Sequence, residues 1–120
     1  VLPFEGGATR RGSVERRQAP LHITSEADPG RSDRIYADTG NHFELTDPIA
    51  RRRVTLRTSG SRTLVVWNPG AEGARTFTDM PPGDWRRFVC LEAANAGADV
   101  IELAPSARHT LGQTITVSDL

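Results

Sequence analysis

The sequence predicts an all-β fold, a sandwich or a barrel of short antiparallel strands, and three observations support this. Apolar and polar residues alternate with a period of two in short segments along most of the chain, as they do in strands with one buried face. Turn-forming residues separate these segments, among them 11 glycines and 8 prolines. Helical patterns are weak, because the two candidate segments, 71–79 and 92–98, are short and contain glycine.

We expect strands at 21–27, 33–37, 42–45, 53–57, 63–67, 87–92, 100–103 and 110–117. The segment 53–57 alternates apolar with charged residues, which predicts a half-buried strand with a charged outer face. Continuous apolar runs at 63–67 and 87–92 predict strands buried on both faces. Residues 1–20 show the least order and predict a surface excursion or a frayed start.

The charge composition excludes several classes of function. Lys+Arg and Asp+Glu balance at 15 each, so no net field would recruit nucleic acid or an anionic membrane. All 15 cations are arginine, which excludes mechanisms that need a Schiff-base or P-loop lysine. The same bias suggests a GC-rich bacterial source.

The single cysteine and the lengths of the apolar runs indicate the cellular compartment. The single cysteine, Cys90, cannot form an internal disulfide, and its apolar neighbours suggest a small buried hydrophobe rather than a nucleophile. No apolar run approaches the length of a membrane span and no segment resembles a signal peptide. Three scattered histidines lack the spacing of a metal site. We therefore expect a cytoplasmic protein.

Three stretches in fixed order carry a family resemblance. They are Asp33-Arg34-Ile35-Tyr36; Val65-Val66-Trp67-Asn68-Pro69-Gly70, followed by Asp79-Met80-Pro81 and Trp85; and Phe88-Val89-Cys90-Leu91-Glu92-Ala93-Ala94-Asn95, followed by Leu103-Ala104-Pro105 and His109-Thr110-Leu111. Together they resemble the hexose-6-phosphate mutarotases (glucose-6-phosphate 1-epimerases) of the aldose 1-epimerase superfamily. The resemblance implies an antiparallel β-sandwich corresponding to the C-terminal part of a galactose-mutarotase-like supersandwich, with residues 1–120 forming a single, incomplete domain.

The resemblance also implies a reaction, the interconversion of the α and β anomers of a hexose 6-phosphate without metal or organic cofactor. Glu92 matches the general base that acts on the C1 hydroxyl, and Asp33 matches the aspartate that hydrogen-bonds sugar hydroxyls. Ring opening needs a base at one oxygen and an acid at its neighbour, which must converge from different strands. We expect partial burial of Glu92 after an apolar strand to raise its pKa towards the working pH.

The family's catalytic histidine, the general acid on the ring oxygen, has no counterpart here. In the family it lies in a Leu-His-x-Tyr-like motif ahead of the Asp-Arg-x-Tyr strand, and His22, His42 and His109 do not fit that motif. The matching position falls upstream of Val1, as do most of the family's phosphate-contacting arginines. We therefore expect the chain alone to catalyse poorly, and an incomplete sandwich to form homo-oligomers or aggregates through an exposed sheet.

Each of these residues also has a purely structural interpretation. Glu92 could be a strand-end carboxylate facing water, and Asp33 a turn residue. Trp67 ends an apolar run, which favours the core over a sugar platform. The Arg51–Arg53 run favours a solvated strand edge over a phosphate site. The alternative function is a non-catalytic carbohydrate-binding β-sandwich module, in which Asp33 contacts sugar and Glu92 does no chemistry.

Overall fold

The computed structural model of the chain describes residues 3–5, 8–10, 13–15, 21–22, 31–37 and 40–120. Its strands are β1 (Pro3–Glu5), β2 (Ala8–Arg10), β3 (Ser13–Glu15), β4 (Leu21–His22), β5 (Ser32–Ala37), β6 (His42–Asp47), β7 (Arg52–Ser59), β8 (Thr63–Asn68), β9 (Cys90–Ala94) and β10 (Gly112–Asp119). The helical elements are α1 (Gly70–Ala74) and the 3-10 turn η1 (Asp84–Arg87). The all-β prediction is confirmed.

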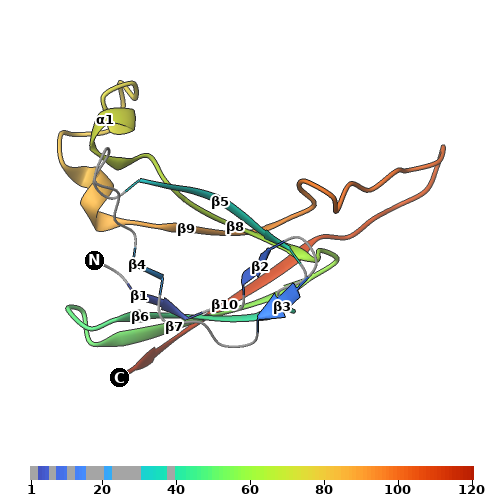
Figure 1. Cartoon of the computed structure of the whole chain (residues 1–120), viewed down its shortest axis with the longest axis horizontal. Coiled ribbons are helices and arrows are strands. Elements are labelled where there is room, and N and C mark those ends of the chain that lie inside the picture. Colours follow the sequence, from blue (N-terminus) through green and yellow to red (C-terminus); the bar gives the residue numbers. More distant parts are fainter. Residues whose placement is uncertain (1–2, 6–7, 11–12, 16–20, 23–30, 38–39) are drawn as a thin grey trace.

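Two antiparallel sheets face each other and form a sandwich (Figure 1). The larger sheet has five strands in the order β10-β7-β6-β1-β4, and the smaller has three in the order β5-β8-β9. Strands β2 and β3 pair only with each other. The chain passes from the large sheet to the small one between β7 and β8, and returns to the large sheet through residues 95–111.

The core lies between the two sheets, because each contributes one apolar face. Phe43 and Leu56 are directly opposite in the β6–β7 register, so they share the inner face of the large sheet. Leu64 and Val66 of β8 come from the small sheet, and all four side chains are at most 1% exposed. Val89 and Leu91 pack against this cluster. Each such buried side chain stabilises the fold by about 1.5–3 kcal/mol.

The predicted charged outer face of 53–57 is confirmed. Leu56 is buried while Arg53 and Arg57 are exposed, and the Arg53 side chain lies 3.9 Å from Glu44 of the neighbouring strand. The expected strand edge at Arg51–Arg53 is wrong, because β7 is flanked by β6 and β10. The arginines are solvated, and Arg52 forms an ion pair with Asp47.

Two other expectations are wrong. The strands β8 and β9 are not buried on both faces, because Val65 and Trp67 of β8 are half-buried and every residue of β9 is half-buried or exposed. The segment 100–103 is not a strand: it belongs to an exposed arm, residues 100–111, that projects from the sandwich (orange to red in Figure 1). Within residues 1–20, the described parts form the short strands β1, β2 and β3. Most of the expected strand 21–27 lies outside the described residues.

Gly60 fixes the point where the returning arm crosses the turn between β7 and β8. Its φ is +76°, which favours glycine. A Cβ at this position would stand 1.9 Å from the carbonyl oxygen of Thr110, so any side chain would push the arm away. Only glycine allows the two backbone segments to approach this closely.

Candidate functional site

The register of the small sheet brings Asp33 and Glu92 to the same face. Asp33 is opposite Trp67 in the β5–β8 pair, and Trp67 is opposite Cys90 in the β8–β9 pair. Glu92 lies two residues beyond Cys90. Side chains that are directly opposite, or two apart along a strand, point to one face of a sheet. Asp33 and Glu92 therefore stand at diagonal corners of one face, across the central strand.

The spacing between the two carboxylates suits a small polyol. Two strand spacings across and two residues along place their Cα atoms about 12 Å apart. Both side chains are exposed, so both can reach a ligand on this face. The expected partial burial of Glu92 is wrong. The interpretation of Asp33 as a turn residue is also wrong, because it lies within strand β5.

Trp67 forms the centre of this face. It is half-buried, and it is not a member of the core cluster, because the core side chains of β8, Leu64 and Val66, point to the opposite face. Trp67 thus belongs to an aromatic cluster outside the central core. Its indole contacts Phe77 edge-on, with ring centroids 6.1 Å apart, and Phe88 at a tilt of 36° and 6.3 Å.

The side chain of Asn68 anchors the segment that carries these phenylalanines. Its amide nitrogen donates hydrogen bonds of 2.7 Å to the backbone carbonyls of Trp85 and Phe88. Its oxygen accepts a hydrogen bond of 2.9 Å from the backbone N–H of Gly70. Asn68 is only 3% exposed, so this one amide connects the end of β8 to α1, to η1 and to the approach of β9. The sequence predicted only a turn at this Asn-Pro-Gly.

A second anchor follows Glu92 along the chain. Asp99 is 7% exposed and accepts hydrogen bonds from the backbone N–H of Arg62 at 2.7 Å and from the Asn95 side chain at 3.0 Å. The Arg62 guanidinium adds an ion pair at 3.2 Å. The Arg62 backbone N–H, with help from Asn95 and the guanidinium, holds the pKa of Asp99 below its ordinary value. Asp99 thereby fixes the loop after β9, a role that no local pattern in the sequence indicated.

The surroundings of Cys90 make its thiol a poor nucleophile. Burial, and then the negative charge of Glu92, raises the pKa of its thiol, which disfavours the nucleophilic thiolate at neutral pH. The thiol is half-buried, not buried as predicted.

The two described histidine side chains belong to elements outside the small sheet. His42 belongs to β6 of the large sheet, where its ring stands 3.9 Å from Glu44. His109 belongs to the arm and hydrogen-bonds Asn95 at 3.0 Å. Neither is part of the strands that carry Asp33 and Glu92. The side chain of His22 is outside the described part of the chain.

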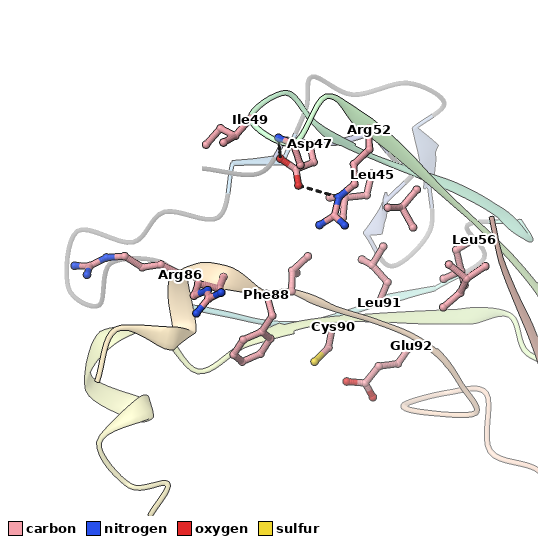
Figure 2. A pocket seen from close by; sticks show the side chains of 15 residues that line it. Leu45, Asp47, Ile49, Arg52, Leu56, Arg86, Phe88, Cys90, Leu91 and Glu92 are labelled. Atoms are coloured by element: carbon pink, nitrogen blue, oxygen red, sulfur yellow. Dashed lines mark hydrogen bonds and ion pairs between the residues drawn. The ribbon is translucent and has the colours of Figure 1, made fainter. Parts of the chain in front are cut away.

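A cleft of about 720 Å³ opens between the two sheets on the other side of β9. Apolar side chains line most of it, and the ion pair of Asp47 and Arg52 stands at its rim (Figure 2). Figure 2 shows Leu91 pointing towards this cleft, whereas Cys90 and Glu92 point to the opposite side of β9. The cleft is thus an opening of the core, and it lies on the opposite side of β9 from the face that carries Asp33 and Glu92.

Within the described residues, no group of three or more potential ligands could hold a metal ion. The helices of the same part of the chain are all too short to cross a membrane.

Comparison with known proteins gives a consistent picture. The model of the family described as Aldose 1-epimerase matches residues 2–116. A protein of Escherichia coli (strain K12) named "Putative glucose-6-phosphate 1-epimerase" is 31% identical over 68 residues, 57% of this chain and 23% of that protein. A protein of Salmonella typhimurium with the same name is 32% identical over 92 residues, 75% of this chain and 30% of that protein. The matched region thus spans less than a third of either relative. No solved structure gives a significant match.

Proposed function

The chain belongs to the aldose 1-epimerase family, and on that premise we propose that its small sheet forms the base side of a hexose-6-phosphate mutarotase site. In this proposal Glu92 is the general base and Asp33 binds sugar hydroxyls. One observation supports it above the others: the β5–β8–β9 register places both carboxylates on a single open face. The names of the two relatives suggest the substrate, glucose 6-phosphate.

The chemistry follows from the two oxygens at the anomeric carbon. Glu92 takes the proton of the C1 hydroxyl while an acid protonates the ring oxygen, and the bond between C1 and that oxygen breaks to give an aldehyde and a free hydroxyl. Rotation about the C1–C2 bond presents the other face of the aldehyde. The same two groups, with their protonation states exchanged, then close the ring to the other anomer. No redox partner is needed, because no atom changes oxidation state in the net reaction.

Neither described histidine lies on the strands that carry Asp33 and Glu92, because His42 belongs to the large sheet and His109 to the arm. We propose that a histidine from outside residues 1–120 supplies the acid. That separation is also the observation that favours the second candidate, a carbohydrate-binding module in which Asp33 binds sugar and no proton transfer occurs.

Exchange NMR of the two glucose 6-phosphate anomers separates the two candidates. The chain would be measured alone and as part of the complete polypeptide that its gene encodes. If the protein is a mutarotase, the exchange rate should rise in the complete polypeptide, and Glu92→Gln should lower that rate about 10²–10⁴-fold. Glu102→Gln, in the exposed arm, is the matched control and should keep full activity. If Glu92→Gln leaves the exchange rate unchanged, Glu92 is not the base.

A further inference from the structure

The side chain of Trp67 lies between the two carboxylates on this face of the small sheet. Asp33 and Glu92 lie at diagonal corners of the face, so the line between them crosses the central strand β8 between Trp67 and Val65. A ring held by both carboxylates must therefore rest over these two side chains. Hydrogen bonds of about 2.8 Å on either side fit within the span of about 12 Å between the Cα atoms.

Trp67 lies outside the central core of the sandwich. The core of the sandwich lies on the other face of β8, where Leu64 and Val66 are completely buried. On its own face Trp67 remains half-buried. Its aromatic neighbours, Phe77 (interplanar angle 76°) and Phe88 (36°), are not parallel to the indole, so neither ring forms a flat stack with it.

We propose that Trp67 is a stacking platform for the apolar C–H face of the hexose ring, a role that rests on the proposed function of this face. A pyranose carries its hydroxyls around the edge and C–H groups on its faces. The indole offers an apolar, electron-rich surface that matches the C–H face, while Asp33 and Glu92 engage the hydroxyl edge from two sides. An aromatic surface with a few converging polar groups is the usual composition of a small-ligand site.

The second tryptophan provides an internal comparison. Trp85 lies in η1, and the guanidinium of Arg86 covers its ring at 4.6 Å. Its backbone carbonyl is bound by Asn68, but its ring is not a member of the cluster around Trp67. Trp85→Phe therefore leaves Trp67 as the single indole of the chain, since the sequence contains two tryptophans, and Trp67→Phe leaves only Trp85.

Fluorescence titration of these two variants tests the proposal without requiring activity. Glucose 6-phosphate should change the emission of Trp85→Phe saturably, whereas Trp67→Phe should show no change. Sorbitol 6-phosphate, which lacks a ring, and inorganic phosphate should both have little effect on Trp67. In saturation-transfer NMR, Trp67→Leu should bind the hexose about five- to tenfold more weakly than the wild type, and circular dichroism establishes that this variant is folded.

The outcomes distinguish the platform from the chemistry. If Glu92→Gln still binds glucose 6-phosphate and Trp67 still responds, the platform stands whether or not Glu92 proves to be the base. If the sugar binds with unchanged affinity to Trp67→Leu, or binds to Trp85→Phe without altering its emission, the platform is wrong while the role of Glu92 is unaffected. Absence of saturable binding to both the wild type and Trp85→Phe also overturns the proposal.

Discussion

Replacing Asn68 should destabilise the fold far more than its position in a turn suggests. Asn68→Ala removes three hydrogen bonds of a buried side chain, two donated to carbonyls at 2.7 Å and one accepted at 2.9 Å. A net contribution of about 1 kcal/mol for each bond gives a loss of about 3 kcal/mol in the free energy of unfolding. For a domain of this size, with an unfolding entropy of about 2.1 cal/mol/K per residue, that corresponds to a fall in Tm of roughly 12 °C.

Asn68→Asp is the sharper variant, because it keeps the shape of the side chain and the acceptor for Gly70. A carboxylate would place oxygen against the carbonyl oxygens of Trp85 and Phe88, so we expect a loss at least as large as that of Asn68→Ala at neutral pH. Acidification should recover part of it, since a protonated carboxyl can donate one hydrogen bond.

Urea unfolding followed by circular dichroism measures these changes. Asn41→Ala, at an exposed position, is the matched control and should change stability by no more than about 0.5 kcal/mol. The reasoning fails if Asn68→Ala behaves like Asn41→Ala, or if Asn68→Asp is as stable as the wild type at pH 7.

Three further outcomes follow. Hydrogen bonding lowers the pKa of Asp99 in the folded state from its ordinary value of 3.8. The stability that the carboxylate contributes is therefore present at neutral pH and is lost as the pH falls below that value. In urea titrations, Asp99→Asn should be less stable than the wild type at pH 7, and its free energy of unfolding should fall less on acidification. Glu92→Gln should lower the raised pKa of Cys90 and speed its reaction with a disulfide reagent at pH 8 a few-fold, whereas Glu44→Gln in the other sheet should not. We also expect self-association that rises with concentration in sedimentation velocity, because Ile115 and Val117 are 58% and 59% exposed at the free edge of the large sheet; Val117→Lys should weaken it, and a wild type that stays monomeric throughout would contradict the prediction.

Local patterns in the sequence predicted most of the strands correctly. Alternation identified β7 and β10, because their apolar residues fall on the inner face of one sheet. It failed at 100–103, where Val100 and Ile101 are apolar but none of the described strands pairs with them. An apolar run indicates a preference for burial, and whether a partner exists is decided by the rest of the fold.

The candidate site was only partly predictable for a similar reason. The family resemblance supplied Asp33 and Glu92 as separate residues, but their common face depends on the register of strands that are far apart in the sequence. No local signal encodes that register. The same holds for Trp67, whose apolar neighbours favoured the core, and for Asn68 and Asp99, whose hydrogen-bond partners lie up to 37 residues away.

The pairing of β10 with β7 has a consequence for how the chain is made. Gly112 lies opposite Ser59 and Asp119 opposite Arg52, so the outer edge of β7 finds its partner only after residues 112–119 have been synthesised. Until then the β6–β7 hairpin presents an open row of backbone donors and acceptors while the arm is still being translated. Closing so long a loop is slow, and open edges of this kind are where nascent chains misassociate. A chaperone that shields this edge during translation would therefore improve the yield of folded protein without touching the site.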